Sequence, residues 1–544
     1  MLQKPDAADW LTWRRTTDGW GFSPLAQITR RNVKRLQLVW TRGLGSGVQE
    51  GTPLVHDGVM FFPNPGDFIQ ALDAATGDLQ WEHRRRLPAD LGKYVAVAVT
   101  NRNLAIYDHL ILDLGADSYV YALDAKSGEM VWETKVLDYR KSGLQGSGPI
   151  IAGGKVISGR SCEPASGPDA CVITAHDPMT GKELWRTRTI PKQGEPGDDT
   201  WGGIPDEQRR QVGAWMAPSY DPALNLIYVG TSVTAPAPKY MLAGNERQYL
   251  YHNSTLALNA DTGKIIWYYQ HIVDHWDLDH AYERILLDTQ VAPDAKQVTW
   301  INPAVKPGRV RKVLTGIPGK TGIVYTLDRQ TGEFLWARPT IFQNVVKGID
   351  GATGRVSVNP DVTFDAVGQE RVVCPHLTGG KNWQAGTYSP LAHTMFFPLQ
   401  NTCSNVQSIA DNGDYSIVTR GSIAPGTDKL GTIYAISVKT GALVWKYQQR
   451  AATMSLLSSA GGLVFAGDVS GRFRAFDDRN GNILWEVNLG SAVTGFPVTY
   501  SVGGRQYVAV STGTSIASSG TTMLTPEIHP GNSSNLFVFA LPTR

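Results

Sequence analysis

Residues 71–81 read ALDAATGDLQW, and the same pattern occurs seven times along the chain. Each copy begins with a small residue or Thr, has Gly six positions later and Trp ten positions later. The Asp-x-x-Thr-Gly element is typical of a tight turn between two strands, because Gly readily adopts a positive φ. The Trp is then expected to pack between neighbouring units. The copies lie at residues 71–81, 122–132, 175–185, 257–267, 326–336, 435–445 and 475–485.

A strand-forming repeat of about 40 residues is typical of one blade of a β-propeller. The segment NVKRLQLVW, residues 32–40, indicates an eighth unit that lacks an upstream turn. The strand-like C-terminal segment NLFVFALP, residues 535–542, is expected to complete this N-terminal blade, close the ring and cover its strand edges. We therefore predict an all-β protein: one eight-bladed β-propeller domain with tryptophan-docking motifs over residues 1–544.

Two intervals between repeat tryptophans are much longer than the others. They run from Trp185 to Trp267 and from Trp336 to Trp445. Long insertions at fixed places in a repeat fold usually build the binding face. We expect functional residues to come from these two intervals.

Composition and charge exclude several classes of protein. Hydrophobic residues make up 42% of the 544 residues and charged residues 18%, which fits a folded soluble protein and excludes a disordered one. The net charge of +2 is too small to indicate the basic surface that nucleic-acid-binding proteins carry. The short run Arg84-Arg85-Arg86 is expected to be a solvated loop. No apolar run is long enough to span a membrane.

The four cysteines fall into two local pairs, Cys162 with Cys171 and Cys374 with Cys403. Neither pair has the Cys-x-x-Cys spacing of zinc sites or c-type haem attachment. An even number in local pairs favours disulfides and an oxidising compartment, and free buried thiols are the alternative. Met1 is followed by polar sequence without a signal peptide. The protein is therefore either cytosolic or a form whose signal was removed and a start Met supplied.

The tryptophan-docked propeller with these turns resembles the quinoprotein alcohol dehydrogenases, which use pyrroloquinoline quinone (PQQ). The resemblance covers nearly the entire chain. It begins with DWLTWRRTTDGWGFSPLAQITRRNVKRLQLVW and continues through GIVYTLDRQTG, CPHLTGGKNW, GRFRAFDDRNGNILWE and GGRQYVAV. In this family PQQ lies in the central funnel beside a metal ion, and an Asp base removes the alcohol proton as hydride moves to the quinone. The resemblance also implies a periplasmic location and matches Cys374 and Cys403 to a structural disulfide.

The stretch DHWDLDH, residues 274–280, carries the implied metal site. Taken alone, it is typical of a solvated Asp-rich turn. Family members have Trp-Asp-Tyr at the catalytic base, and the resemblance assigns that role to Asp277. Asp279 two residues later resembles the lanthanide-using branch, and the calcium branch usually has a small or neutral residue there. Glu163, in SGRSCEP, matches the metal-binding Glu of the family, with a surface-loop Glu as the alternative. The implied ligands of Ca²⁺ or a lanthanide are thus Glu163, Asp277 and Asp279.

The implied quinone contacts are spread over the chain. Lys320, in GKTGIVYTLDR, matches the catalytic basic residue that bonds the quinone and carboxylate oxygens of PQQ. Arg102, in TNRNLA, matches another family cation. Trp215, in GAWMAPSYDP, matches the tryptophan on which PQQ stacks, with a blade-core Trp as the alternative. The remaining implied cofactor contacts are Glu50, Asn382 and Trp383.

The chain departs from the family pattern at two places near the cofactor. Val233, in GTSVT, stands where the family has a metal-binding Asn, so that Ser232, Thr234 or Asp279 would have to make up the loss. Many members carry two adjacent cysteines over PQQ, whereas residues 94–98 read YVAVA, so that Val97 is a candidate to cover that face. The family's Thr-Gly-Ala-Pro is altered to Gly-Ser-Gly-Pro at residues 146–149. These changes imply a reshaped funnel.

Two functions follow from these features. The first is a PQQ- and metal-dependent dehydrogenase of small-molecule alcohols that passes electrons to an external cytochrome c or similar acceptor, because the chain has no Cys-x-x-Cys-His haem motif. The second is a non-catalytic propeller that scaffolds periplasmic protein assembly. A six-bladed PQQ sugar dehydrogenase is excluded by the number of repeats. The reshaped funnel favours a bulky or secondary alcohol over methanol, and the family includes enzymes of trichothecenes such as deoxynivalenol, of polyvinyl alcohol and of simple primary alcohols.

Overall fold

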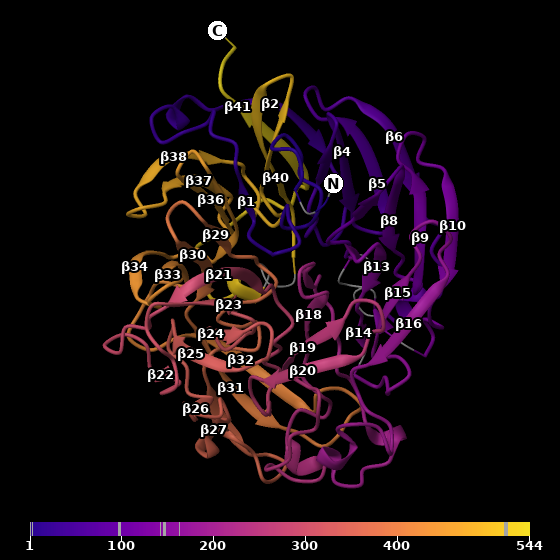
Figure 1. Cartoon of the computed structure of the whole chain (residues 1–544), viewed down its shortest axis with the longest axis vertical. Coiled ribbons are helices and arrows are strands. Elements are labelled where there is room, and N and C mark those ends of the chain that lie inside the picture. Colours follow the sequence, from indigo (N-terminus) through magenta and orange to yellow (C-terminus); the bar gives the residue numbers. More distant parts are fainter. Residues whose placement is uncertain are drawn as a thin grey trace.

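The computed structural model describes residues 2, 4–95, 100–141, 143–144, 148–162, 164–515 and 520–543. Within these ranges, sheets of four or five strands follow one another around a ring, and the four principal strands of each sheet are antiparallel to their neighbours. Figure 1 shows the ring from one end, with the chain passing from sheet to sheet as the colour changes from indigo to yellow. Eight sheets of this size are present among the described residues, which confirms the predicted eight-bladed propeller. No helix in the same ranges is both long and apolar enough to cross a membrane.

The first four blades each consist of four strands, numbered from the innermost strand outwards. Blade 1 has β3 (Leu54–His56), β4 (Val59–Asn64), β5 (Phe68–Asp73) and β6 (Leu79–Arg84). Blade 2 has β7 (Ala105–Tyr107), β8 (Leu110–Leu114), β9 (Tyr119–Asp124) and β10 (Met130–Lys135). Blade 3 has β12 (Ile150–Ala152), β13 (Lys155–Ser158), β15 (Val172–His176) and β16 (Glu183–Arg188). Blade 4 has β17 (Ser219–Asp221), β18 (Leu226–Gly230), β19 (Ser254–Asn259) and β20 (Ile265–Gln270).

The other four blades follow the same order, and two of them gain a short fifth strand. Blade 5 has β21 (Ile285–Val291), β23 (Arg309–Gly316), β24 (Ile323–Asp328), β25 (Phe334–Pro339) and an added β22 (Trp300–Ile301). Blade 6 has β29 (Thr387–Ser389), β30 (Thr394–Gln400), β33 (Gly431–Ser437) and β34 (Leu443–Gln449). Blade 7 has β35 (Thr453–Ser459), β36 (Leu463–Asp468), β37 (Arg472–Asp477), β38 (Ile483–Asn488) and an added β1 (Phe22–Ser23). Blade 8 has β39 (Val498–Val502), β40 (Arg505–Thr512), β41 (Asn535–Ala540) and β2 (Gln37–Gly43).

Blade 8 joins the two ends of the chain. Strand β2 pairs in antiparallel fashion with β41, from Gln37 opposite Ala540 to Gly43 opposite Asn535. Three of its strands come from the C-terminal part and only the outer one from the N-terminal part. Strands β2 and β41 lie side by side at the top of Figure 1. This pairing removes a pair of free sheet edges and locks the ring.

Each repeat Gly rests on the Trp ring of the preceding blade. A Cβ placed on Gly128 would come within 2.5 Å of the Trp81 ring, and one on Gly77 within 2.6 Å of the Trp40 ring. Both glycines have positive φ, so only Gly fits the turn and the contact together. The predicted packing of Trp between units is thus confirmed, and Trp40 docks blade 8 onto blade 1. The other Gly–Trp contacts of this kind are Gly181 with Trp132, Gly263 with Trp185, Gly332 with Trp267, Gly441 with Trp336, and Gly481 with Trp445.

The long intervals contribute small sheets and short 3-10 helices outside the blades. The interval after Trp336 forms the hairpin β26–β27 and the three-stranded sheet β28-β31-β32. In a further pair, β11 precedes blade 3 and β14 lies in the connection from β13 to β15 of that blade. The strands are β11 (Gly143–Leu144), β14 (Ser161–Cys162), β26 (Val346–Ile349), β27 (Val356–Val358), β28 (Glu370–Val373), β31 (Thr402–Ser408) and β32 (Ile417–Ile423). The 3-10 helices are η1 (Val33–Arg35), η2 (Leu91–Lys93), η3 (Asp198–Trp201), η4 (Asp206–Gln208), η5 (Lys239–Met241) and η6 (Pro360–Val362).

Both predicted cysteine pairs are disulfides. Cys162 is bonded to Cys171 and Cys374 to Cys403. The second bond ties the end of β28 to β31, at the base of the inserted sheet. Disulfides of this kind are typical of oxidising compartments.

The N-terminal segment braces several blades from within. Trp10 bonds through its backbone to Val55 of blade 1, and the carbonyl of Thr17 accepts from Tyr220 of blade 4. Farther along, β1 pairs in parallel with β35 of blade 7. Trp10 is completely buried. The segment therefore connects blades that are far apart in sequence.

The prediction of a solvated loop at residues 84–86 is wrong for Arg85. Its side chain is only 7% exposed and its guanidinium lies 2.9 Å from Oδ2 of Asp117 and 2.9 Å from Oε2 of Glu133. It also stacks near the rings of Tyr119 and Tyr121. Arg85 thus links blades 1 and 2, because the carboxylates compensate the burial of its charge.

Candidate active site

The predicted site residues lie mainly on loops that enter the innermost strands. In a propeller, each such loop leads from the outer strand of one blade to the inner strand of the next, so these loops share one end of the ring. Glu50 precedes β3, Arg102 precedes β7 and Trp215 precedes β17. The turn at residues 274–280 precedes β21, and Asn382 precedes β29. The exception is Lys320, on the connection from β23 to β24.

The turn at residues 274–280 is organised by Asp274. Its Oδ1 accepts the backbone N–H groups of Trp276, at 2.7 Å, and of Asp277, at 3.1 Å, and its side chain also accepts from the N–H of Leu278. Asp277 has a φ of 106°, a strained value for a residue with a side chain. Asp274 is completely buried. The turn is therefore a rigid, buried structure and not a solvated one.

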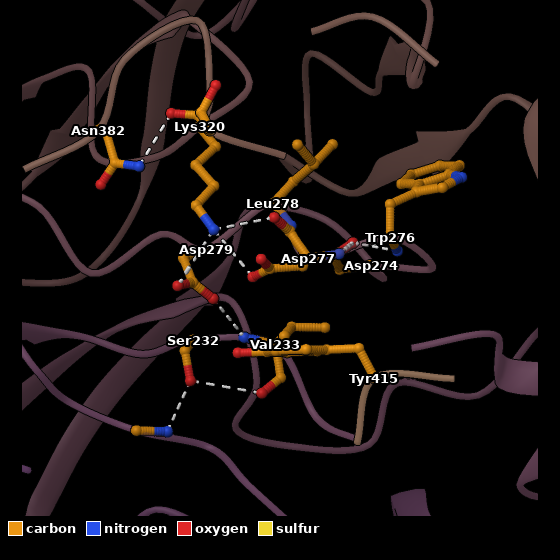
Figure 2. Close-up of polar contacts among 12 residues, drawn as sticks. Ser232, Val233, Asp274, Trp276, Asp277, Leu278, Asp279, Lys320, Asn382 and Tyr415 are labelled. Atoms are coloured by element: carbon orange, nitrogen blue, oxygen red, sulfur yellow. Dashed lines mark hydrogen bonds and ion pairs between the residues drawn. The ribbon is translucent and has the colours of Figure 1, made fainter. Parts of the chain in front are cut away.

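Two carboxylates of this turn converge on one ammonium group (Figure 2). Nζ of Lys320 lies 2.9 Å from Oδ1 of Asp277, 3.0 Å from its backbone carbonyl oxygen and 3.5 Å from Oδ2 of Asp279. The backbone N–H of Lys320 also donates to the carbonyl of Asp279 at 2.8 Å. With both carboxylates ionised, this cluster has one negative charge more than positive charge. Its oxygen donors fit a hard cation such as Ca²⁺ or a lanthanide.

Burial and charge shift the protonation of these groups. Burial raises the pKa of Asp277 well above its usual value, Lys320 opposes this shift and Asp279 adds to it. Burial alone would lower the pKa of Lys320, but the carboxylates of Asp277 and Asp279 outweigh it and raise that pKa. The ammonium is therefore held charged. A further cation near Asp277 would favour its ionised form.

A second charged cluster adjoins the first through Trp215. Arg102 forms an ion pair of 2.7 Å with Glu50, and its guanidinium carbon lies 5.2 Å from the centre of the Trp215 ring. Burial raises the pKa of Glu50, and Arg102 opposes the shift. The indole N–H of Trp215 donates to Oδ2 of Asp279 at 3.0 Å. Trp215 therefore connects the two clusters, which a blade-core Trp would not do.

Tyr282 and Asn382 border the same region. The Tyr282 ring meets the Trp215 ring edge-on at 5.4 Å, and its hydroxyl donates to Oδ1 of Asn382 at 3.1 Å. The amide oxygen of Asn382 also accepts the backbone N–H of Trp383 at 2.8 Å. The N–H of Gly380 donates to the carbonyl of Lys320 at 2.8 Å, which holds this loop against the first cluster. Figure 2 shows Asn382 on the Lys320 side of the site.

Buried hydrogen-bond donors surround the second cluster without partners of their own. Among the described residues, no partner is present for Nε2 of Gln49, Oγ1 of Thr52, Oγ1 of Thr100 or Nε1 of Trp383. These groups are next to predicted cofactor contacts in sequence, and the N–H of Thr52 donates to the carbonyl of Arg102 at 2.9 Å. Buried donors in native proteins are normally satisfied, so a ligand with several acceptor oxygens fits here. A tricarboxylate quinone has that character.

Two of the sequence predictions lie outside the described residues. These are Glu163, the third implied metal ligand, and Val97, the candidate to cover the quinone. Ser147 of the altered motif at residues 146–149 also lies outside them.

The hydroxyl groups of Ser232 and Thr234 each have a backbone partner. The Ser232 hydroxyl accepts the N–H of Gly213 at 2.7 Å, and that of Thr234 donates to the carbonyl of Arg210 at 2.6 Å. Both hydroxyls are therefore engaged with the backbone. Val233 instead contributes its own N–H, which donates to Oδ1 of Asp279 at 2.9 Å (Figure 2). That Ser232, Thr234 or Asp279 makes up for the missing Asn stays a prediction.

The sequence reasoning missed two residues of the site. Tyr415 extends from the inserted sheet alongside Val233, whose N–H bonds to Asp279, and Nε2 of Gln211 donates to the Tyr415 hydroxyl at 2.6 Å. They come from the two long intervals between repeat tryptophans. The length of these intervals was the one sequence feature that pointed to functional residues there. Neither residue belongs to a local motif.

Comparisons with known proteins agree with this geometry. A family model described as glucose/ethanol/alcohol dehydrogenase, beta-propeller domain, of the PQQ type, matches residues 10–341 and 448–508. The dehydrogenase subunit of alcohol dehydrogenase (quinone) from Gluconobacter oxydans is 29% identical over 560 residues, covering 93% of this chain and 70% of the relative. Quinoprotein alcohol dehydrogenase PedH of Pseudomonas putida is 30% identical over 527 residues, covering 91% and 84%. 1-Butanol dehydrogenase (cytochrome c) of Thauera butanivorans is 30% identical over 553 residues, covering 93% and 74%.

Solved structures give the same result. A quinohemoprotein alcohol dehydrogenase, ADHIIG of Pseudomonas putida, superposes with a TM-score of 0.87 at 28% identity, over 99% of this chain and 81% of that chain. A europium-containing methanol dehydrogenase gives a TM-score of 0.87 at 26% identity, over 99% of both chains. The family, the fold and the arrangement of charged residues lead to one conclusion, which the scaffold alternative does not explain. The chain belongs to the PQQ-dependent alcohol dehydrogenase family and is an enzyme of that class.

Proposed function

We propose that this protein oxidises an alcohol to a ketone or aldehyde at the cluster of Asp277, Asp279 and Lys320, with PQQ and a metal ion as its cofactors. The observation that carries the proposal is the convergence of two carboxylates on the Lys320 ammonium, joined through Trp215 to Arg102. This set combines hard oxygen ligands, two cations and an aromatic platform. Those are the groups that a metal-assisted quinone site requires.

Asp277, Asp279 and Glu163 would hold the metal ion. Asp277 and Asp279 already face a common cation, the Lys320 ammonium. The second carboxylate at Asp279 adds negative charge, which suits a trivalent ion better than Ca²⁺. Likeness to a europium-containing methanol dehydrogenase supports a lanthanide as one of the two candidates.

Asp277 would act as the base in the reaction. Its side chain is 15% exposed, so a substrate hydroxyl can reach it. The carboxylate takes the hydroxyl proton while the C–H bond of the carbinol carbon breaks and a carbonyl forms. When bound, PQQ would supply the acceptor for the hydride of the carbinol carbon, and the metal ion would supply Lewis-acid assistance. Lys320 and Asp279 keep the Asp277 carboxylate oriented for this transfer.

Arg102, Lys320 and the nearby donors would bind PQQ. The guanidinium of Arg102 lies over the Trp215 ring. The ammonium of Lys320 is near the Asp279 carboxylate that accepts the indole N–H of Trp215. The unpartnered donors of Thr52 and Trp383 would bind carboxylate oxygens. Glu50 fixes the orientation of Arg102, Asn382 adds a further contact, and the Trp215 face supplies the stacking surface.

The proposal extends to the surroundings of the enzyme. Electrons would leave the reduced cofactor to an external cytochrome c, which the similarity to 1-butanol dehydrogenase (cytochrome c) of Thauera butanivorans supports. A periplasmic location is supported by the two disulfides. The replaced residues near the cofactor favour a bulky or secondary alcohol, and a trichothecene such as deoxynivalenol belongs to that class.

Reconstitution tests the proposal. Protein stripped of metal is given PQQ with either Ca²⁺ or La³⁺, and dye reduction is followed with a panel of primary and secondary alcohols. We expect alcohol-dependent dye reduction only when PQQ and a metal are both present. The exposed Asp261, changed in Asp261→Asn, controls for unspecific effects of losing a carboxylate. An absence of turnover with every alcohol and both metals would overturn the proposed function.

A further inference from the structure

Tyr415 belongs to a part of the molecule that is not a blade. It lies in the connection between β31 and β32, the antiparallel pair inserted after Trp336. The backbone N–H of Ala237 donates to the carbonyl of Tyr415 at 2.9 Å. Arg210 forms an ion pair of 2.9 Å with Asp411 of the same connection. The tip of this hairpin is therefore fastened to the two loops of blade 4 that carry Gln211 and Val233.

The Tyr415 side chain extends toward the part of the site that holds Asp279. Figure 2 shows its ring extending alongside Val233, on the side toward which Asp279 points. Burial raises the pKa of the Tyr415 phenol well above its usual value, and the charges of Asp277 and Asp279 raise it further. Both carboxylates therefore act on this hydroxyl through space. The side chain is half-buried, and its hydroxyl bonds to the buried Gln211.

Gln211 and Tyr415 share one hydrogen bond and leave two bonding capacities unused. Nε2 of Gln211 donates to the Tyr415 hydroxyl oxygen at 2.6 Å, so that oxygen acts as an acceptor there. Among the described residues, no acceptor is recorded for the Tyr415 O–H, and none donates to Oε1 of Gln211. Gln211 is only 4% exposed. A half-buried donor, the Tyr415 O–H, thus lies next to a buried acceptor, Oε1 of Gln211, and native proteins rarely leave a buried group of the latter kind unsatisfied.

We propose that Gln211 and Tyr415 form a subsite for a second oxygen of the substrate. The substrate would be an alcohol that carries a further hydroxyl or ether oxygen close to its carbinol carbon. The Tyr415 O–H would donate to that oxygen, and a second hydroxyl could also donate to Oε1 of Gln211. This inference rests on the proposed function, because it requires the carbinol to lie at Asp277.

The specificity follows from the cost of leaving buried polar groups unpaired. A site built to bond a substrate oxygen discriminates strongly against the analogue that lacks it. Hydrocarbon alcohols of the same shape would leave the pair unsatisfied. The subsite therefore selects oxygenated alcohols over hydrocarbon alcohols of equal size.

Matched substrates test the subsite. Cyclohexanol and tetrahydropyran-3-ol have the same ring size and differ by one ether oxygen, and trans-1,2-cyclohexanediol adds a hydroxyl. We measure kcat/KM of the reconstituted full chain for the three and compare the ratios. We expect the oxygenated alcohols to exceed cyclohexanol by about tenfold or more, and Tyr415→Phe to lower both ratios by about tenfold.

Two further variants separate bonding from packing. Gln211→Glu places a carboxylate where it would accept the Tyr415 proton, so we expect the ratios to fall although Tyr415 is present. Tyr240→Phe removes a hydroxyl that bonds to Ser408 of the same inserted sheet at 2.8 Å, away from the carboxylates. This control should keep the wild-type ratios, because it loosens the hairpin without changing the subsite.

The outcomes distinguish this inference from the proposed function. Turnover of all three alcohols at similar kcat/KM, or ratios that survive in Tyr415→Phe, would overturn the subsite and leave the proposed function standing. Equal loss of the ratios in Tyr240→Phe would also overturn it, because hairpin position and not the phenol would then set specificity. No PQQ-dependent turnover of any alcohol would overturn the proposed function and the subsite with it.

Discussion

Two buried lysines flank the turn at residues 274–280, and their surroundings differ. Nζ of Lys320 faces the carboxylates of Asp277 and Asp279, which raise its pKa against the effect of burial. Nζ of Lys239 faces backbone carbonyls, of which that of Ala237 is nearest at 2.6 Å. Burial lowers the pKa of Lys239 to about 7, and Asp274 opposes the shift only in part.

The contrast separates a functional cation from a structural one. Lys320 is held charged by an excess of carboxylate, so its surroundings can accept a further cation and its ammonium can bind an anion. Lys239 ties the carbonyls of Thr234, Pro236 and Ala237 together, in the loop that follows Val233. It therefore supports the loop whose N–H groups bond Asp279 and Tyr415. The same residue type, equally buried, thus has different roles because of its partners.

The largest effect is expected from removing the base at the Lys320 cluster. Asp277→Asn keeps the shape of the side chain but cannot take the hydroxyl proton, so kcat should fall by about a thousandfold or more. Steady-state dye reduction with saturating PQQ and metal measures the loss. PQQ binding should remain, as followed by quenching of tryptophan fluorescence. Retention of more than about a tenth of wild-type kcat would assign the base to another group.

Removing the cation between the carboxylates should cost stability. Lys320→Met leaves Asp277 and Asp279 buried and facing each other, which should lower the free energy of unfolding of the metal-free protein by about 3–5 kcal/mol. Urea denaturation measures this change. Addition of La³⁺ should stabilise the variant more than the wild type, because the ion replaces the lost charge. An equal response of both proteins to La³⁺ would show that the carboxylates do not share a cation.

A change at the ion pair of Glu50 and Arg102, whose charges balance, should lower the free energy of unfolding less than Lys320→Met does. Glu50→Gln removes one charge of an ion pair, and we expect the metal-free protein to lose about 1.5–3 kcal/mol of unfolding free energy. PQQ should restore more stability to the variant than to the wild type, because its carboxylates can take the place of Glu50 at Arg102. Thermal denaturation with and without PQQ provides the comparison. If PQQ stabilises both proteins equally, Arg102 does not bind its carboxylates.

The smallest expected effect, counted per pH unit, is the change in the free energy of unfolding that the titration of Lys239 causes. Its pKa is about 7 in the folded protein and the ordinary value of 10.5 after unfolding. Between these values the unfolded chain binds more protons, so this group makes stability rise with pH, by at most about 1.4 kcal/mol per pH unit. Lys239→Met should abolish that part of the slope between pH 7 and 10. A variant with the same slope as the wild type would contradict the assignment.

Local repeats made the fold predictable, whereas the site required contacts between distant residues. The Thr-Gly turn and the Trp ten positions into each repeat lie in one short segment, so blade number and docking could be predicted. Family resemblance placed Asp277, Asp279 and Lys320 at the site, and the structure brings them together.

Other features had no local signal. The bond between Gln211 and Tyr415 spans 204 positions, and nothing near either residue indicates it. The burial of the Arg85 side chain depends on Asp117 and Glu133 in the next blade, so the prediction of a solvated loop was wrong for this one of the three arginines. The bonds of the Ser232 and Thr234 hydroxyls to backbone groups likewise depend on loops that meet only in the fold.

Binding of PQQ to the stripped protein tests the central claim most directly. Tryptophan fluorescence is followed while PQQ is added in the absence of metal and in the presence of Ca²⁺ or La³⁺. We expect saturable binding at one PQQ per chain, tighter with metal, and weakened in Lys320→Met and in Trp215→Ala. No saturable binding under any of these conditions, or binding unchanged in both variants, would contradict the assignment of the Asp277–Asp279–Lys320 cluster as the cofactor site.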